Sequence, residues 1–126
     1  MNGPVLIIED NEQNRYLVAF LLERCGYRVV TAEDGERGID AAREHLPSMI
    51  LLDIQLPAMD GYAVARALRG IDALRGTPIV AVTAHAMTGD SERALAAGCD
   101  AYIEKPIDPE RFVPSLRDLG LPPAGA

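Results

Sequence analysis

The sequence predicts a doubly wound α/β fold, in which helices cover both faces of a five-stranded parallel sheet. Five short apolar runs each stop at polar residues, near positions 9, 31, 53, 82 and 104. Each gap between two runs holds one segment with the apolar spacing or the boundary residues of a helix. Strands and helices that alternate in this way form parallel sheets, whose ligands bind at the carboxyl ends of the strands.

Each predicted strand is a short segment rich in apolar and β-branched residues and bounded by polar or turn-forming residues. An apolar run of this length is typical of a strand buried on both faces of a parallel sheet. The strand that ends at Asp53 is central, because its four apolar residues stop on a carboxylate. In chain order, the predicted strands are Val5–Ile8, Tyr27–Thr31, Met49–Asp53, Pro78–Thr83 and Ala101–Glu104.

The predicted helices are indicated by apolar residues at helical spacing and by capping residues at their ends. In the first helix, Leu17, Leu21 and Cys25 form one apolar stripe, and Gly26 follows as a stop signal. In chain order, the predicted helices run from Asn11 to Cys25, from Asp34 to His45, from Tyr62 to Arg69, from the Thr88–Asp90 start signals to Gly98, and from Asp108 to Gly120.

The last predicted helix contains a proline. Asp108 and Pro109 are an N-cap followed by proline at the first helical position. Pro114 would remove an amide donor and clash with the carbonyl of Glu110, so we expect a kink there unless the helix begins later. We expect one domain over residues 1–120 and a short flexible tail over residues 121–126.

Composition excludes several classes of function. A net charge of −7 argues against direct binding to nucleic acid or to an anionic membrane. No apolar run approaches the roughly 20 residues of a membrane-spanning helix, and the N-terminus has no signal-peptide pattern, so a cytoplasmic protein is expected. Cys25 and Cys99 lie outside any metal-binding spacing, and we expect both to be small core residues.

Polar side chains gather at the predicted carboxyl edge of the sheet, at Glu9, Asp10, Asp53, Thr83 and Lys105. Three neighbouring carboxylates repel one another, and a hard divalent cation such as Mg²⁺ offsets that repulsion. We therefore predict that Asp10 and Asp53 bind Mg²⁺ directly. The backbone carbonyl of Gln55 is predicted as a third ligand, and Glu9 as a ligand through water. The alternative is a cluster of acidic loop residues that are solvated independently.

The same edge has the groups that phosphoryl transfer needs. A carboxylate beside Mg²⁺ can attack phosphorus as a nucleophile and form an aspartyl phosphate. Lys105 would supply a point charge and Thr83 a hydroxyl donor to the phosphoryl oxygens. Lys105 is the only lysine among twelve basic residues, which modestly favours a specific role for it. The bond between Lys105 and Pro106 is a candidate cis peptide that would aim the ammonium inward.

Several segments together resemble the motifs of bacterial response-regulator receiver domains: Leu6–Asn11, Leu51–Pro57 with Asp60–Gly61, Val82–Ala84 and Lys105–Pro106. The resemblance covers Val5 to about Leu119, nearly the whole chain. Within the family, Thr83–Met87 and Ala97–Tyr102 are most similar to single-domain regulators of the DivK type and to receivers of hybrid histidine kinases. Because the chain begins with Met1 and ends just after the last helix, we expect the stand-alone form.

The resemblance implies a flavodoxin-like sheet with strand order 2-1-3-4-5. It also implies a phosphoacceptor at Asp53, a metal site at Glu9 and Asp10, and a functional lysine at Lys105. Thr83 and Tyr102 would form a switch pair that responds to phosphorylation. The phosphoryl group would come from the phosphohistidine of a histidine kinase or a histidine phosphotransferase.

Two surfaces are predicted to bind partners. Gln13, Asn14 and Leu17, at the start of the first helix, are expected to contact the helical phosphodonor because they lie next to the predicted site. A downstream protein is expected to bind the face formed by the fourth helix, the fifth strand and the fifth helix.

Other functions fit less well. A receiver from a hybrid histidine kinase would look the same as a stand-alone regulator. A small Mg²⁺-dependent phosphatase that uses an aspartate nucleophile needs a second aspartate two residues later, where this chain has Gln55. A flavin-binding protein of this fold class needs a Ser/Thr/Gly-rich phosphate-binding loop after the first strand, which this sequence lacks. A DNA-binding regulator needs an effector domain, which is also missing from this sequence. We therefore expect a phosphoacceptor that helps to catalyse its own phosphorylation and dephosphorylation, rather than an enzyme with a separate substrate.

Overall fold

The computed structural model describes residues 3–56, 59–84 and 89–124, with only the backbone of residues 90 and 91. Its centre is one parallel sheet with the strand order β2-β1-β3-β4-β5, which confirms the predicted fold class and strand order. The adjacent strands pair in regular parallel register, each pair over four residues. The strands are β1 (Val5–Ile8), β2 (Val29–Ala32), β3 (Met49–Asp53), β4 (Ile79–Thr83) and β5 (Ala101–Glu104).

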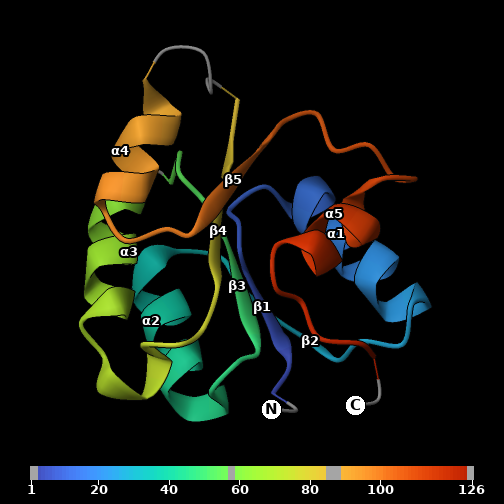
Figure 1. The fold of residues 1–126 in the computed structure, drawn as a ribbon, viewed down its shortest axis with the longest axis horizontal. Coiled ribbons are helices and arrows are strands. Elements are labelled where there is room, and N and C mark those ends of the chain that lie inside the picture. Colours follow the sequence, from blue (N-terminus) through green and yellow to red (C-terminus); the bar gives the residue numbers. More distant parts are fainter. Residues whose placement is uncertain (1–2, 57–58, 85–88, 125–126) are drawn as a thin grey trace.

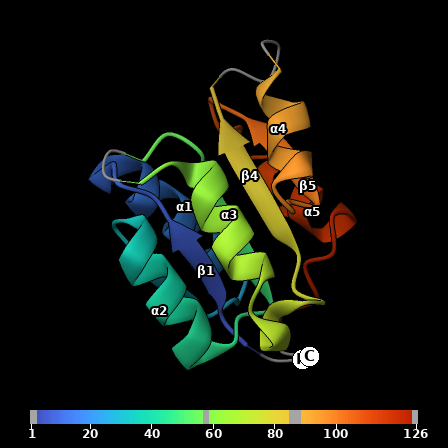
Figure 2. The same cartoon turned by 90° about the vertical axis from the view of Figure 1, so that its left-hand side faces the viewer.

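Helices cover both faces of this sheet. In Figures 1 and 2, α2, α3 and α4 lie together on one face, and α1 and α5 lie on the other. A short 3₁₀ helix, η1, follows α3 and was not predicted from the sequence. The helices are α1 (Glu12–Arg24), α2 (Gly35–His45), α3 (Gly61–Arg69), η1 (Asp72–Leu74), α4 (Asp90–Ala96) and α5 (Phe112–Asp118). Thr88, one of the predicted start signals of α4, lies outside the described residues.

The core consists of two apolar layers, one on each face of the sheet. Successive side chains of a strand point to opposite faces, so Leu6 and Ile8 pack with α2 and α3, whereas Val5 and Ile7 pack with α1 and α5. All four residues of β1 and all five of β3 are buried. The unbroken apolar runs thus correspond to strands covered on both faces, as the sequence predicts.

Helix α1 begins as predicted, because the side chain of Asn11 accepts a hydrogen bond from the backbone N–H of Asn14 at 2.9 Å. The prediction that Cys25 is a core residue is wrong, since it lies exposed at the C-cap of the helix. The helix ends at Arg24, and the backbone of Cys25 has already left helical geometry, with φ −91° and ψ 7°. Its position past the last turn therefore exposes Cys25, although the helical spacing would have placed it with the buried Val18, Leu21 and Leu22. Cys99 is buried, as expected.

The start of the last helix also differs from the prediction. Asp108 and Pro109 belong to a turn, and α5 begins later, at Phe112. Pro114 is therefore the third residue of the helix, where a backbone N–H has no partner within the helix. The helix therefore loses no hydrogen bond through the missing N–H of Pro114. This is the alternative of a later helix start, which the sequence left open. The Lys105–Pro106 bond is cis, as the sequence suggested.

The side chain of Arg69 donates hydrogen bonds to several loops at the amino edge of the sheet. The Arg69 side chain, at the end of α3, is only 25% exposed, and all three of its guanidinium nitrogens donate hydrogen bonds. Asp100, which accepts one of them at 2.8 Å, also accepts the backbone N–H of Ile79 at 2.8 Å. The acceptors of Arg69 are the carbonyls of Leu74, Arg75, Thr77 and Gly98 and the carboxylate of Asp100. We call Arg69 and these acceptors the Arg69 network.

The two ends of the described chain lie at the same edge of the sheet, opposite the carboxyl ends of the strands (Figure 1). Residues 121–124, the first part of the predicted flexible tail, pack against the domain. Leu121 is 4% exposed, and the carbonyl of Pro122 accepts a hydrogen bond from the Tyr27 hydroxyl at 2.8 Å. The flexibility of residues 121–126 as a whole stays a prediction.

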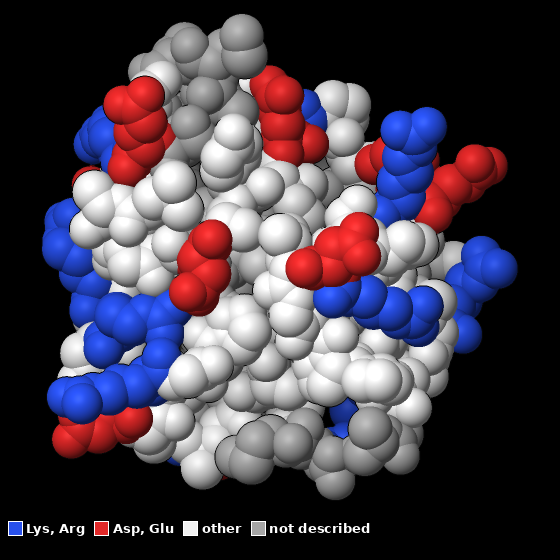
Figure 3. All heavy atoms as spheres, in the orientation of Figure 1, with Lys and Arg blue, Asp and Glu red and all other residues white. Residues whose placement is uncertain are grey.

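On the face shown in Figure 3, acidic and basic side chains are interspersed, and much of the surface between them is uncharged. That face therefore has no continuous basic surface of the kind that binds a phosphate backbone. Within the described residues, no helix is both long enough and apolar enough to span a lipid bilayer.

Candidate functional site

The carboxyl edge of the sheet brings the predicted site residues together. Ile8 pairs with Leu52, so Glu9 follows β1 beside the position of Asp53 at the end of β3. Thr83 is the last residue of β4 and pairs with Glu104, immediately before Lys105. The backbone N–H of Lys105 donates to the carbonyl of Thr83 at 2.8 Å. Parallel register alone thus gathers residues that are far apart in the sequence.

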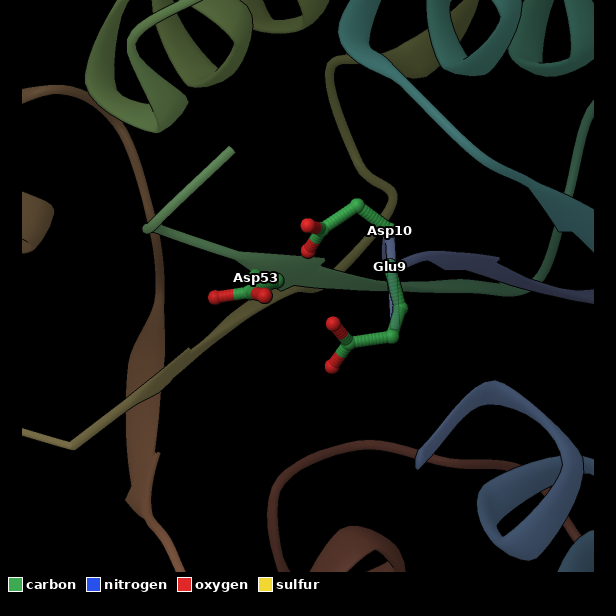
Figure 4. A group of neighbouring side chains, drawn as sticks. All are labelled: Glu9, Asp10 and Asp53. Atoms are coloured by element: carbon green, nitrogen blue, oxygen red, sulfur yellow. The ribbon is translucent and has the colours of Figure 1, made fainter. Parts of the chain in front are cut away.

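Three carboxylates form a compact cluster at this edge. One ligand atom from each of Glu9, Asp10 and Asp53 lies within 4.8 Å of the others. Figure 4 shows the carboxyl groups of Glu9 and Asp10 extending from the end of β1 toward Asp53. Glu9 and Asp53 are 5% and 3% exposed, whereas Asp10 is exposed to solvent. The cluster therefore combines two shielded carboxylates with one that solvent reaches.

Lys105 faces the two buried carboxylates. Its Nζ lies 3.4 Å from Oδ2 of Asp53 and 3.5 Å from Oε1 of Glu9. One ammonium therefore faces a cluster of three carboxylates, which leaves an excess of negative charge. In a partly buried site this excess is costly unless a proton or a cation neutralises it.

The excess charge affects the protonation of Glu9. Burial, together with the neighbouring Asp53 carboxylate, raises the pKa of Glu9 to about 7. The backbone N–H of Asn11 and the ammonium of Lys105 oppose this increase, because both favour the charged form. A proton on Glu9 near neutral pH thus neutralises part of the negative charge that a bound cation would neutralise.

Backbone and side-chain donors hold the site loops in place. The N–H of Gln55 donates to Oδ1 of Asp53 at 2.9 Å, which orients the carboxylate and places Gln55 directly beside it. Arg15, in α1, donates through Nη1 to the backbone carbonyls of Glu9 at 2.9 Å and Asp10 at 3.4 Å. Arg15 was not predicted from the sequence, although an arginine one turn into the helix that follows the acidic residues is a usable signal.

The predicted switch residues occupy adjacent strands. Thr83 is 1% exposed, and Tyr102 is 43% exposed on β5, at the edge of the sheet. Tyr102 pairs with Ala81, two positions before the pair formed by Thr83 and Glu104. Tyr102 thus lies on the strand next to Thr83, two register positions away, and is substantially exposed.

The predicted docking residues lie beside the same site. Gln13 is exposed, and Asn14 and Leu17 are half-buried on α1. Asn14 and Leu17 line a cavity of about 420 Å³ that Asp53 and Lys105 also line. The start of α1 is therefore continuous with the carboxylate site.

Comparison with known proteins gives one consistent result. The family described as the response regulator receiver domain matches residues 5–117. The polar-differentiation response regulator DivK of Brucella anthropi is 47% identical over 117 residues, which cover 93% of this chain and 95% of that protein. DivK of Brucella ovis is 45% identical with the same coverage.

Solved structures agree with the sequence comparison. The chemotaxis protein CheY4 of Vibrio cholerae has a TM-score of 0.89 and 27% identity, over 94% of this chain and 99% of that chain. The receiver domain of a sensor histidine kinase from Pseudomonas aeruginosa, with a magnesium ion coordinated in its active-site cleft, has a TM-score of 0.85 and 34% identity. That match covers 94% of this chain and 98% of the other.

Fold, site and comparisons lead to the same conclusion. The sheet order 2-1-3-4-5 places an acidic cluster compatible with Mg²⁺ at the carboxyl edge, in a chain closely similar to a response regulator over most of its length. The chain belongs to the response-regulator receiver family, whose members interact with histidine kinases and downstream partners, and it is a phosphoacceptor switch of two-component signalling.

Proposed function

We propose that Asp53 is the residue that accepts the phosphoryl group, from the phosphohistidine of a histidine kinase or a histidine phosphotransferase. The observation that supports this assignment is the position of the Asp53 carboxylate at the sheet edge, 3.4 Å from the ammonium of Lys105. In the transfer, a bond forms between an Asp53 oxygen and phosphorus as the phosphorus–nitrogen bond breaks. The electron pair of that bond goes to the imidazole of the donor, and the carboxylate nucleophile has no proton to lose.

Lys105 and Thr83 are proposed to stabilise the phosphoryl group during transfer. Lys105 already faces Oδ2 of Asp53, so its charge is in place before phosphoryl oxygens arrive. Thr83 ends the neighbouring strand β4, and its hydroxyl would donate a hydrogen bond to one of those oxygens. Preorganised donors of this kind stabilise the charge that develops on the three phosphoryl oxygens.

Glu9, Asp10 and Asp53 are proposed to hold Mg²⁺, with the backbone carbonyl of Gln55 as a further ligand. Asp10 and Asp53 would be direct ligands and Glu9 a ligand through water. The fit is supported by three carboxylate oxygens within 4.8 Å of one another. Burial and the neighbouring Asp53 carboxylate also raise the pKa of Glu9 to about 7, so the cluster binds a proton readily when no cation is present. When bound, Mg²⁺ supplies the positive charge that neutralises the cluster and the incoming phosphoryl oxygens.

The chain is proposed to help catalyse its own phosphorylation and dephosphorylation and to act on no separate substrate. A phosphatase with an aspartate nucleophile would need an acid two residues after Asp53 to protonate the leaving group. Gln55 occupies that position, and its amide side chain has no acidic proton to give. Its backbone N–H donates a hydrogen bond to Asp53.

Phosphorylation is proposed to act on Tyr102 through Thr83. The phosphoryl group adds about −1.5 to −2 charges at the sheet edge and draws the Thr83 hydroxyl toward it. The space that Thr83 leaves would allow Tyr102, now 43% exposed, to turn inward. This movement would change the face formed by α4, β5 and α5.

Partner recognition is proposed to use two separate surfaces. The helical phosphodonor would contact Gln13, Asn14 and Leu17, since the last two line the same cavity as Asp53. A downstream protein would bind the face of α4, β5 and α5. We propose a cytoplasmic protein whose partners are other proteins, without direct binding to nucleic acid or membranes, in keeping with its net charge of −7.

Mass spectrometry after incubation with acetyl phosphate and Mg²⁺ tests the assignment of Asp53. We expect one added phosphoryl group in the wild-type protein, on the peptide that contains Asp53. The Asp53→Asn variant keeps the shape of the side chain but removes the nucleophile, so it should remain unlabelled. Labelling of Asp53→Asn to the wild-type extent would show that another residue accepts the group.

A further inference from the structure

The exposed side of α1 carries an aromatic pair that the proposed function does not use. Tyr16 and Phe20 are 72% and 44% exposed, and their rings stack on each other with the centroids 6.3 Å apart. At about 100° of rotation per residue, both lie on the side of the helix opposite the buried Val18. Two large aromatic side chains exposed together favour an interaction surface over an ordinary solvated helix face.

Charged residues flank this pair at helical spacing. Glu12 lies one turn before Tyr16, Arg24 lies one turn after Phe20, and both charged residues are exposed. The guanidinium carbon of Arg24 lies 5.7 Å from the centroid of the Phe20 ring. The four residues Glu12, Tyr16, Phe20 and Arg24 form one ridge at i, i+4 spacing, which we call the α1 stripe. It has opposite charges at its two ends and two aromatic rings in the middle.

This order makes the α1 stripe complementary to itself. When two copies meet antiparallel about a two-fold axis at the middle of the stripe, Glu12 of each copy faces Arg24 of the other. Tyr16 of each copy faces Phe20 of the other in the same way. Helices that pack through their i±4 ridges cross at about 50°, and this crossing brings the two inclined stripes into line. Axes without this crossing would bring Glu12 close to Glu23 of the second copy, where like charges repel.

A shallow hollow beside the stripe has room for an incoming ring. Its volume is about 300 Å³, and it is lined by Glu12, Arg15, Tyr16, Ala19 and Thr31. The small side chain of Ala19 leaves this space open next to Tyr16. In ridge-into-groove packing, the ridge of one helix enters the groove beside the ridge of the other. Phe20 of a second copy would therefore fit against Tyr16 in this hollow.

We propose that the α1 stripe binds a second copy of this chain, in a weak symmetric dimer built from two antiparallel α1 helices. Two such helix faces form a small interface, below the roughly 1,200 Å² of buried surface that is usual for stable complexes, so the dimer should form only at high micromolar concentrations. A second copy fits better than an unrelated helix, because the chain itself supplies the matching order of charges and rings. The proposed role of Asp53 has no part in this pairing.

Charge reversals at the two ends of the stripe test the pairing. Glu12→Arg would place two arginines opposite each other at both ends of the dimer, and Arg24→Glu would place two glutamates there. Each variant alone should raise the dissociation constant of the dimer at least about tenfold. An equimolar mixture of the two variants should restore the wild-type affinity within about threefold, because each pair again joins opposite charges. Sedimentation equilibrium of the whole protein, at one fixed ionic strength and up to about 1 mM, measures these affinities.

Three controls separate the pairing from other effects. Glu12→Arg removes two units of negative charge from a chain of net charge −7, which by itself favours association, so a weaker dimer indicates local repulsion. Arg43→Glu makes the same charge change as Arg24→Glu at an exposed position on α2, on the other face of the sheet, and should leave the dissociation constant unchanged. Phe20→Ala keeps the charges and should weaken the dimer about tenfold.

The other possible results contradict the dimer. A wild-type protein that stays monomeric up to about 1 mM would overturn it and would leave the α1 stripe to a different partner, such as a helix of the phosphodonor. A dimer that neither charge reversal weakens, or that the mixture of variants fails to restore, would show that Glu12 does not face Arg24. An equal loss of affinity in Arg43→Glu would show that net charge, rather than the stripe, controls association. Phosphorylation of Asp53 is measured separately and is decided by none of these results.

Discussion

Two charged regions at opposite edges of the sheet are built in opposite ways. At the amino edge, the Arg69 network surrounds one cation with carbonyl oxygens and one carboxylate, and every guanidinium nitrogen donates. At the carboxyl edge, one ammonium, that of Lys105, faces two carboxylates of a cluster of three. The first region has matched groups, whereas the second has an excess of negative charge.

The difference separates structural from functional use of charge. A satisfied network in a partly buried position stabilises the fold, because breaking it leaves polar groups without partners. An unmatched carboxylate cluster instead lowers stability and raises affinity for cations and protons. Stability is thus concentrated where the loops join the amino edge, and reactivity where the strands end at the carboxyl edge.

Removing the guanidinium of Arg69 should have the largest effect. Arg69→Ala leaves the carbonyls of Leu74 and Gly98 and the carboxylate of Asp100 without their donor, so we expect the free energy of unfolding to fall by about 3 to 4 kcal/mol. Urea denaturation measures this change. Arg66→Ala, an exposed arginine of the same helix, is the control and should change stability by under about 0.5 kcal/mol. Similar values for the two variants would remove the contrast between the edges.

The pH dependence of stability should reveal the raised pKa of Glu9 at the carboxyl edge. Because the pKa of Glu9 rises from 4.5 to about 7 on folding, the folded state binds more protons than the unfolded state between these values. The free energy of unfolding should therefore fall by about 2 to 3 kcal/mol as pH rises through this window without Mg²⁺, and stay low above it.

Glu9→Gln isolates this contribution. The amide has no proton to lose, so the difference between wild-type and variant stability should vary with pH only where Glu9 titrates. Denaturation curves in a chelator, from pH 4 to pH 8, provide the measurement. A difference that is flat across this range would show that the pKa of Glu9 is not raised in the folded protein.

Asp10→Ala should have a smaller effect, which raises stability without metal and lowers Mg²⁺ affinity. Removing one of three neighbouring carboxylates relieves repulsion, so stability without metal should rise by about 1 kcal/mol. Mg²⁺ affinity, measured by calorimetry, should fall at least about tenfold because a direct ligand is lost. Asp40→Ala, an exposed carboxylate on α2, is the control and should leave Mg²⁺ binding unchanged. Full Mg²⁺ affinity in Asp10→Ala would contradict the proposed ligand set.

Thr83→Ala should have the smallest effect on stability and phosphorylation, yet a specific effect on signalling. Asp53 and Lys105 remain in place, so labelling should continue within about threefold of the wild-type rate. The response of Tyr102 to beryllofluoride, followed by NMR, should be largely lost, because the ligand no longer favours one conformation over the other. Thr83→Ser keeps the hydroxyl and should retain the response. A full response in Thr83→Ala would mean that coupling follows another route.

The sheet and the core of the site were predictable because both depend on local patterns. Unbroken apolar runs that end on Glu9, Asp53 and Thr83 identify buried strands and their carboxyl ends. Parallel pairing then brings those ends to one edge, whatever their separation in the sequence. The residue types at the edge were enough to suggest a cation and phosphoryl chemistry.

The parts that were missed depend on tertiary contacts. Nothing near Arg69 in the sequence shows that the loops before β4 and before β5 supply its acceptors. Leu121 follows the stop signal Gly120, so it looks like part of a tail until the structure shows it buried. The turn at Asp108 has strong helix-start residues, but apolar packing begins only at Phe112, and packing decides where this helix starts.

The placement of the chain ends has a consequence for how this domain combines with others. Both ends of the described chain lie at the amino edge, and the side chain of Ala124 lies beside Gly26, which precedes β2. A second polypeptide fused to either end would therefore begin about the length of a strand away from the carboxylate cluster. Fluorescent reporters or tethered effectors can be attached there without covering the entrance used by a phosphodonor. The same geometry lets one module work alone or as a building block within a longer protein.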